Sequence, residues 1–316
     1  MKQIFKPLIL SFALGALMAC NQSPSTTKGG DVKSISAVAE TKSEFKEGVI
    51  GIKITTPGSG IGELLQQIDP SKGNSSEQMR KLMEKLSVKD KMKIDAQSKK
   101  NGMLNLAILM LPIKSTLYVK GADATAKFDA VTYHGENRVN EAKKEGMMYV
   151  KSQNSAKEMT VSYTGDSFKE MNTNELRMED YDIVKTDETE NVAGYTCTKA
   201  VYTLKASAKP KQSEAEVSAG VPSGTVYKID VWTSKEMPKS VNFLHPLYVK
   251  EDAGIMKLNI QYQKDNDLKI VYEFASVESR PVTAAELAVK QTSKIHDFGK
   301  DKMTVGMQMF GVILGM

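Results

Sequence analysis

From Ser115 onward the sequence is divided into short segments in which apolar and polar residues alternate. Four such segments, STLYVKG, ATAKFDAVTYHG, GMMYVKSQ and KEMTVSYTG, follow one another, separated by glycine, asparagine, aspartate or serine. Alternation with a period of two is typical of strands that have one buried face. Because the spacing of about ten residues leaves room only for short connections, the region predicts a meander of antiparallel strands.

A longer pair of strand patterns lies between Asn191 and Pro238. NVAGYTCTKAVYTLKA and GTVYKIDVWTSKEMP are rich in β-branched and aromatic residues, and they flank a polar stretch at 205–223. This arrangement predicts a long antiparallel ribbon with an exposed loop at its tip. The segments Ile255–Lys264 and Leu268–Val277 predict a further hairpin.

The part of the chain before this meander mixes strand and helix signals. In Glu44–Thr56 isoleucines alternate with small or polar residues, which predicts a half-buried strand. The sequence PGSGIGE that follows has neither the G-x-G-x-x-G spacing nor a GK[ST] sequence, so its glycines are interpreted as a turn and not as a nucleotide-binding loop. Met103–Leu111 is the most apolar internal run. It is too short to cross a membrane. Periodicity does not separate a buried helix from a buried strand here, and the excess of Met, Leu and Ala over β-branched residues favours the helix.

The segment Asn74–Lys100 has the periodicity of an amphipathic helix, which Asn74 can cap. Four apolar side chains fall on one face of this helix: Met79, Leu82, Met83 and Leu86. We expect this face to cover the core of its own domain. The alternative is that the basic helix lies on an anionic membrane surface.

The C-terminal part, 283–316, begins with a helix signal and ends in an apolar tail. Thr283 and Glu286 have the spacing of a capping box, which predicts a helix that starts in the segment Thr283–Phe298. The tail MTVGMQMFGVILGM, from Met303, has 14 residues and is too short for a membrane span. It is expected to pack into a groove.

The first residues carry the pattern of an export signal. Two early lysines precede the apolar run PLILSFALGALMA, whose 13 residues are too few for a stable membrane span. The run ends in Leu17-Met18-Ala19-Cys20, which resembles the lipobox of bacterial lipoproteins. We expect residues 1–19 to be removed and Cys20 to carry a covalent lipid; the alternative is a plain secretory signal that contains a cysteine. Apart from this lipid, no cofactor is expected.

Asn21 and not aspartate follows Cys20, so the resemblance implies an anchor in the outer membrane of a Gram-negative cell, on its periplasmic side or at the cell surface. Residues 20–44 are rich in serine, threonine, glycine and lysine and predict a disordered tether. The alternative is that the stretch SISAVA docks as a strand.

Composition and scattered reactive residues limit the chemistry. Without the two lysines of the export signal the chain has 41 basic and 38 acidic residues among 316, a balance too mild to indicate a nucleic-acid partner. His134, His245 and His296 lie far apart, and no H-E-x-x-H, G-x-S-x-G or S-x-x-K sequence occurs, so neither a metal site nor a catalytic residue is predicted. Cys197 is interpreted as a small buried residue and not as a nucleophile. An acidic cluster is interpreted as solvated surface: Glu175, Glu179, Asp180 and Asp182.

Particular residues of the ribbon also carry a resemblance to a known family. They are Val192, Gly194, Tyr195, Cys197, Lys199 and Ala200, followed by Val231, Trp232, Thr233 and Pro238. Together with LYVKGADATAKFDAV they resemble an exported family of Gram-negative proteins of unknown function with a LolA/LolB-like fold, related to the GLPGLI proteins. The resemblance covers about 45–280. It departs from GLPGLI proteins at their naming motif, where only HPLYV is found.

The resemblance implies an α+β fold, mostly antiparallel β: a highly curved, open half-barrel sheet with helices covering its concave face. It carries no established activity. We expect a LolA-like domain over 45–282 with a helical insertion at about 61–111, followed by a C-terminal helix and apolar tail over 283–316.

The function expected first is binding of an apolar or lipid-like ligand in the half-barrel, without catalysis. The residues expected to line the ligand are Met79, Leu82, Met83, Leu86, Leu104, Leu109, Leu111 and Trp232. The alternative is a structural or interaction protein that contacts other envelope proteins through its sheet edge or its long loop. An envelope hydrolase is a third hypothesis, which clustering of His134 or His245 with carboxylates in a cleft would favour.

Overall fold

The computed structural model describes residues 44–100, 108–168, 176–208, 226–245, 247, 249–262, 264 and 268–316. The predicted export signal with Cys20, the tether before Glu44, the start of the apolar run with Leu104, and Glu175 all lie outside these ranges. So does most of the polar loop predicted at 205–223.

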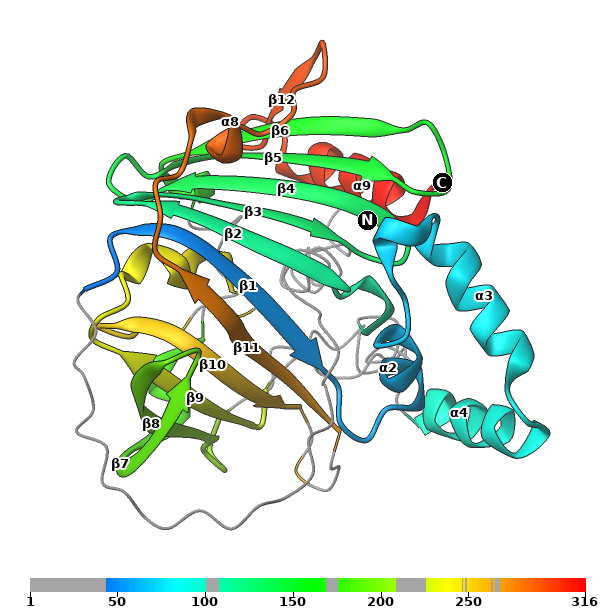
Figure 1. The fold of residues 1–316 in the computed structure, drawn as a ribbon, viewed down its shortest axis with the longest axis horizontal. Helices are drawn as coiled ribbons and strands as arrows, with labels where there is room; N and C mark the ends of the chain where they lie inside the picture. The colour runs from blue at the N-terminus through cyan, green and yellow to red at the C-terminus, as the bar shows by residue number, and fades with distance from the viewer. Residues whose placement is uncertain are drawn as a thin grey trace.

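Within the described residues twelve strands form one sheet, in the order β12-β6-β5-β4-β3-β2-β1-β11-β10-β9-β8-β7 (Figure 1). The strands are β1 (Glu47–Thr55), β2 (Lys114–Lys120), β3 (Asp123–Asp129), β4 (Tyr133–Asn140), β5 (Glu145–Ser152), β6 (Glu158–Thr164), β7 (Tyr181–Val192), β8 (Tyr195–Leu204), β9 (Lys228–Ser234), β10 (Gly254–Gln261), β11 (Lys269–Glu278) and β12 (Ile295–Asp297). Every pairing is antiparallel except that of β12 with β6. The fold class expected from the sequence is thus confirmed.

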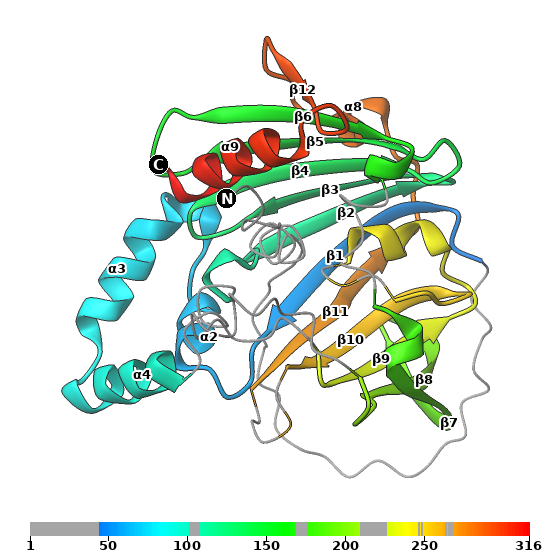
Figure 2. The same cartoon turned by 180° about the vertical axis from the view of Figure 1, so that it is seen from behind.

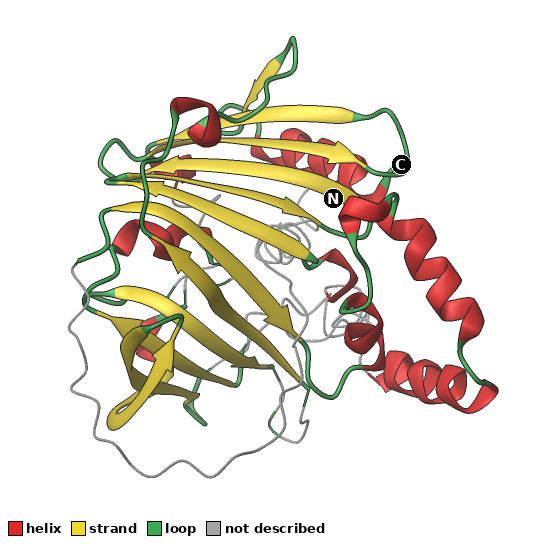
Figure 3. Ribbon diagram, in the orientation of Figure 1, coloured by secondary structure: helices red, strands yellow, loops and turns green. Residues whose placement is uncertain are grey.

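The sheet is open and curved. Its edge strands β7 and β12 do not pair with each other. The short helix η3 (Lys239–Leu244) contacts β10 and also β3 and β4, although β2, β1 and β11 separate β3 from β10 in the sheet. A helix of only six residues can reach both groups only where the sheet curves around it, so η3 lies on the concave face. The sheet as a whole, coloured by secondary structure, is shown in Figure 3.

Side-chain alternation separates the two faces of this sheet. In β1 the residues Ile50, Ile52 and Ile54 are buried and alternate with partly exposed neighbours, because every second side chain of a strand points to the same face. Ile52 pairs with Phe274 of β11, and both point to the concave side, where the hydrophobic core lies. Lys53 pairs with Glu273 and points to the outer face.

The N-terminal helices stand at one end of the sheet (Figure 1). They are α2 (Gly60–Leu65), the 3-10 turn η1 (Pro70–Lys72), α3 (Ser75–Lys85) and α4 (Val88–Lys100). The single helix expected over Asn74–Lys100 is therefore wrong. Asn74 does cap α3 by accepting the Glu77 N–H at 2.9 Å. Leu86 then adopts an extended backbone, and the Ser87 hydroxyl accepts the Asp90 N–H at 3.1 Å and starts α4.

The C-terminal part belongs to the same sheet. The Thr283 capping box is confirmed, but α8 (Ala284–Leu287) has only four residues, so the helix expected in Thr283–Phe298 ends early. Residues 279–294, here called the strap, cross the outer face and lead into β12. The tail then forms α9 (Lys302–Leu314), which lies across β4, β5 and β6 (Figure 2). The tail was expected to pack into a groove, and in the structure it packs as a helix on the sheet.

Two strand assignments differ from expectation. The segment ATAKFDAVTYHG was expected as one strand, but it holds β3 from Ala124 onward, a turn at 130–132 and the start of β4. The acidic segment before the ribbon forms the long edge strand β7, entered through the 3-10 turn η2 (Met178–Asp180). The ribbon itself is confirmed, since β8 pairs with β9 from Thr198↔Thr233 to Thr203↔Lys228. The hairpin of β10 and β11 is confirmed as well.

Candidate functional site

The residues expected to line a ligand are distributed over two faces of the molecule. Met79 and Leu111 are buried, and four others are half-buried and pack against the hydrophobic core: Leu82, Met83, Leu86 and Leu109. Leu104 lies outside the described residues. Trp232 is also buried, but it pairs in register with Lys199 and Lys257 on the outer face. These residues therefore do not form one continuous lining.

Helix α9 is the apolar element that lies over the concave face. Val305, Met309, Val312 and Ile313 are buried on the side that faces β4, β5 and β6. The opposite side is apolar too: Met303 and Met307 are 65% and 66% exposed, and Phe310 and Leu314 are half-buried. These four residues recur at helical spacing and form a stripe, called here the outer stripe of α9. No helix of the described residues is long and apolar enough to cross a membrane.

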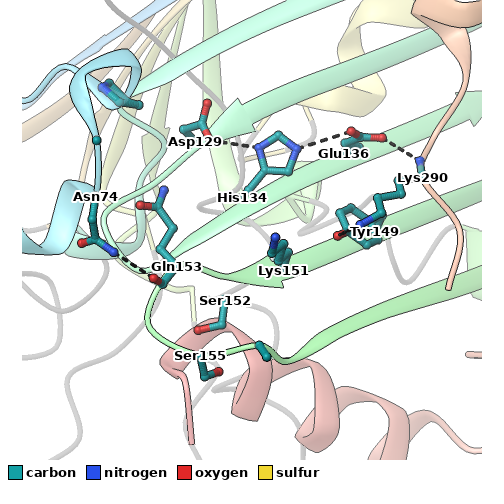
Figure 4. Close-up of a pocket in the computed structure, with 13 residues that line it drawn as sticks. Asn74, Asp129, His134, Glu136, Tyr149, Lys151, Ser152, Gln153, Ser155 and Lys290 are labelled. Atoms are coloured by element: carbon teal, nitrogen blue, oxygen red, sulfur yellow. Dashed lines mark hydrogen bonds and ion pairs between the residues drawn. The ribbon is translucent and has the colours of Figure 1, made fainter.

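A polar pocket of about 640 Å³ lies on the outer face over β3 to β6 (Figure 4). Strand register places two rows of side chains on this face, because directly paired residues of neighbouring antiparallel strands point to the same side. One row is Asp129, His134, Lys151 and Glu158; the next is Lys127, Glu136, Tyr149 and Thr160. The turn before α3 and the turn between β5 and β6 form its other walls.

His134 lies at the centre of the pocket between two carboxylates. Its Nδ1 is 2.9 Å from Oδ1 of Asp129, and its Nε2 is 3.4 Å from Oε1 of Glu136 (Figure 4). Burial lowers the pKa of His134, but the hydrogen bonds to Asp129 and Glu136 and their negative charges outweigh it and raise this pKa to about 9. The imidazole is thus protonated at neutral pH, and both ring nitrogens donate.

The strap supplies a second set of bonds to the same pocket. The backbone N–H of Lys290 donates to Glu136 Oε2 at 2.7 Å. Its ammonium donates to the Tyr149 hydroxyl at 3.0 Å and to Glu158 at 2.9 Å, and Tyr149 donates to Glu158 at 2.5 Å. The hydrogen bonds from Tyr149 and Lys290 lower the pKa of Glu158. The network therefore ties the strap to the strands through charge-assisted bonds.

The clustering of His134 with carboxylates in a pocket is the arrangement that would favour a hydrolase, so its chemistry needs a test. A general base must have a free ring nitrogen within reach of the proton that it removes. Both nitrogens of His134 are bound to carboxylates, and in the described part of the chain no serine, threonine or cysteine is bonded to either of them. Among the described residues no group of three metal-ligating side chains is placed to hold an ion. The pocket has the geometry of a closed ionic network.

The other reactive residues are placed apart from this pocket. His245 is buried among core aromatic residues, and its ring is stacked on that of Phe274 with 5.9 Å between the ring centroids. Burial lowers the pKa of His245 to about 3, so its imidazole is neutral. His296 belongs to the short strand β12. Cys197 is fully buried on β8, as expected, and burial raises the pKa of its thiol to about 12. Such a thiol has very little thiolate at neutral pH.

Sequence reasoning missed the polar pocket because it treated each histidine alone. Asp129 and His134 flank the turn at 130–132, and Glu136 follows His134 at a spacing of two, so the three share a face once the register is known. The signal was present in the alternation of β3 and β4. The contribution of Lys290 had no signal, because it depends on where the strap crosses the sheet.

Comparisons with known proteins add little to this geometry. No family model and no curated protein matches the chain. A solved structure of PNGF-II is 13% identical with a TM-score of 0.37, and the match covers 62% of this chain and 29% of that one. A DUF1329 family protein from Desulfovibrio piger is 12% identical with a TM-score of 0.24, covering 55% of this chain and 81% of that one. At these scores neither structure assigns a family.

Proposed function

We propose that the protein is a lipid-anchored, non-catalytic envelope protein that binds an apolar ligand, such as an acyl chain, on the concave side of its sheet beside α9. The outer stripe of α9 is the observation that carries the proposal. Single exposed apolar residues are ordinary, but a stripe at helical spacing on a helix whose other side is already buried indicates a surface that contacts something else. Methionine side chains repack readily around varied apolar guests.

Two further observations support this proposal. The open, curved sheet is the architecture that the resemblance to LolA/LolB-like proteins implies. The lipobox at Cys20, which lies outside the described residues, would place the domain at the outer membrane of a Gram-negative cell, where acyl chains are abundant. A lipid at Cys20 would hold it there firmly, since each buried methylene stabilises the anchor by ~0.8 kcal/mol.

The test is a titration of residues 45–316 with a fluorescent fatty acid whose emission depends on its environment. We expect saturable binding that phospholipid competes away. Met307→Lys should weaken binding by about tenfold or more, because it places a charge in the apolar stripe. Met92→Lys is the matched control: Met92 is 68% exposed on α4, and its substitution should leave binding unchanged. Absence of saturable binding, or equal weakening by both variants, would reject the proposal.

A second candidate function is contact with envelope proteins through the sheet edge. Edge strand β7 has 12 residues, and its Ile183 and Val184 are 40% and 58% exposed. A long edge with exposed apolar side chains can accept a strand from a partner. The double variant Ile183→Lys with Val184→Lys should then abolish cross-links to envelope proteins in intact cells while fatty-acid binding persists. Unchanged cross-links would exclude this edge.

A further inference from the structure

A second cleft, of about 610 Å³, lies on the outer face of the sheet and away from both the outer stripe of α9 and the His134 pocket. Its floor consists of β2, β1 and β11, and its roof is the tip of the β7–β8 hairpin, which folds back over them. The residues facing each other across it are Asn191, Val192 and Ala193 of the tip and Gly51 and Ser276 of the floor.

The floor has a bare patch of backbone at Gly51. The register of β1 and β11 shifts here, since Gly51 pairs with Ser276 while Ile52 pairs with Phe274, which leaves Ala275 as the extra residue of a β-bulge. A Cβ at Gly51 would lie 2.6 Å from the Ser276 hydroxyl oxygen, so a larger residue there would have to displace that side chain. A glycine at a bulge within a strand is typical of places where a ligand approaches the backbone closely.

Three hydrogen-bond donors around this patch have no partner among the described residues, namely Lys114, Thr116 and Ser276, and a fourth, Lys53, has only a long ion pair. Lys114 makes no ion pair there, and the Nζ of Lys53 comes no closer than 4.0 Å to a carboxylate oxygen, that of Glu273. The hydroxyls of Thr116 and Ser276 make no hydrogen bond within the same part of the chain. Register puts these donors together, because Thr116 pairs with Gly51 and Gly51 pairs with Ser276.

The carboxylates of the cleft are already neutralised by lysines. Glu190 binds Lys257 at 2.5 Å, and Glu273 lies between Lys257 at 3.8 Å and Lys53 at 4.0 Å. Lys53 and Lys114 line the cleft with these two glutamates, and because Lys257 binds Glu190 from outside the lining, Lys114 is left without an ion pair among the described residues. An anion is therefore the ligand that completes the electrostatics.

The roof is held in a conformation that a non-glycine residue seldom adopts. Ala193 has φ 50° and Gly194 has φ 87°, as a two-residue hairpin tip requires, and alanine there is strained. The Gly194 N–H donates to Asn191 Oδ1 at 3.0 Å, so the side-chain oxygen of Asn191 is already bonded, and Asn191 lines the cleft. The Glu190–Lys257 pair fixes this tip above the floor.

We propose that the cleft binds a compact oxyanion, a carboxylate or a phosphate group, between Lys53 and Lys114. The hydroxyls of Thr116 and Ser276 and the amide of Asn191 donate to its oxygens. The group can belong to a free small molecule or to a lipid headgroup. This site is independent of the apolar ligand proposed beside α9, since the two lie on opposite faces of the sheet.

The experiment is an NMR titration of the full, ¹⁵N-labelled chain with inorganic phosphate. We expect saturable shifts of the amide signals of Gly51, Thr116 and Ser276. Lys114→Gln and Lys53→Gln should each weaken binding by about tenfold, because each removes one charge-assisted hydrogen bond. Lys269→Gln is the matched control, an exposed lysine on β11 outside the cleft, and should not change the affinity.

Further arms identify the anion and its source. Acetate in place of phosphate tests whether a carboxylate suffices, and binding of either anion supports the site. Phosphatidylglycerol vesicles that displace phosphate indicate a headgroup, whereas vesicles without effect indicate a free anion. No saturable shift of these amides with either anion, or equal binding by the Lys53→Gln, Lys114→Gln double variant with its remaining spectrum intact, would overturn the proposal. Fatty-acid binding should be unchanged in that variant.

Discussion

The two polar regions of the outer face are built alike but are completed differently. Each consists of charged side chains in register across antiparallel strands, and each is covered by a segment that folds over them: the strap over β3 to β6, the β7–β8 hairpin over β2, β1 and β11. In the first region His134 has both ring nitrogens bonded and Lys290 bonds Tyr149 and Glu158. In the second, Lys114 and the hydroxyls near Gly51 have no partner among the described residues.

This difference distinguishes a region that stabilises the fold from a region that can bind a ligand. A closed network of hydrogen bonds serves stability, whereas donors that face solvent, such as Lys114 and the Ser276 hydroxyl, remain available for a ligand. The His134 pocket attracts attention because it holds the residue types of catalysis. The cleft at Gly51 holds less reactive residues but leaves more of its bonding capacity unused.

The largest loss of stability is expected on substitution of Trp232, whose ring lies against Lys257, the lysine that binds Glu190 of the hairpin tip. Trp232 is 4% exposed, and the Nζ atoms of Lys199 and Lys257 lie 5.1 and 5.7 Å from its ring centroid. Trp232→Ala should lower the free energy of unfolding by about 3–5 kcal/mol, because it leaves a large cavity and removes two cation–π contacts. Urea unfolding followed by circular dichroism measures this. Trp232→Phe should retain much of the stability; an equal loss would show that ring volume is not the cause.

A smaller loss is expected on breaking the closed network. His134→Gln removes the positive charge between Asp129 and Glu136 and leaves two carboxylates facing a neutral amide. We expect a loss of about 1–2 kcal/mol at neutral pH, a value that allows for the partial exposure of the site. Lys151→Gln is the control, because Lys151 lines the same pocket without an ion pair among the described residues. A similar loss in both variants would argue against the network.

The same substitution should change how stability depends on pH. The folded pKa of His134 is raised from 6.5 to about 9, so its contribution is fully present below about pH 6.5 and is lost as the pH rises through 9. The stability difference between the parent chain and His134→Gln should therefore be largest near about pH 6 and nearly vanish near about pH 10. A difference that grows toward high pH would contradict the assignment of His134 as a cation.

Some elements of the fold were predicted from the sequence and others were missed, for physical reasons. Alternation located the meander and the ribbon, because a half-buried strand repeats every two residues, and the Thr283 and Asn74 caps were recognised from local spacing. The long strand β7 was missed, since its burial pattern is mostly exposed and gives little periodic signal. Periodicity also ran past Leu86, where the backbone leaves the helix without a proline or glycine.

The candidate sites depend on information that local patterns do not contain. Asp129 and Glu136 meet His134 through register, and Lys290 arrives from a strap more than a hundred residues away in sequence. Gly51 and Ser276 come from the first and the eleventh strand. Strand pairing of this kind is set by the whole sheet, so a composition-based search for catalytic spacing finds neither region.

A weaker effect is expected at the strap. Lys290→Met removes the bonds from its ammonium to Tyr149 and Glu158 but retains the backbone bond to Glu136. The strap keeps other bonds to the strands, among them Thr125 to the Leu287 carbonyl and the Thr292 N–H to Thr160, so the effect should be local: opening near Lys290 and limited proteolysis within residues 279–294 should become faster. Global unfolding should change little. Lys294→Met is the control, since Lys294 makes no ion pair among the described residues. Equally faster proteolysis in both variants would show that the bonds of Lys290 to Tyr149 and Glu158 are not the cause.

The smallest effect on stability is expected from the last experiment. It uses the reactivity of the Cys197 thiol to test whether the hairpin roof opens. This thiol is fully buried next to the Glu190 that binds Lys257, and burial raises its pKa to about 12. In a chain carrying Cys20→Ser, an aromatic disulfide reagent should therefore react very slowly until denaturant is added. Lys257→Met frees the hairpin tip and should speed the reaction, whereas Lys239→Met, which breaks an exposed ion pair with Asp252, should not. Rapid stoichiometric reaction in the parent chain would show that the roof opens freely, and a cleft that depends on that roof could then not be preformed.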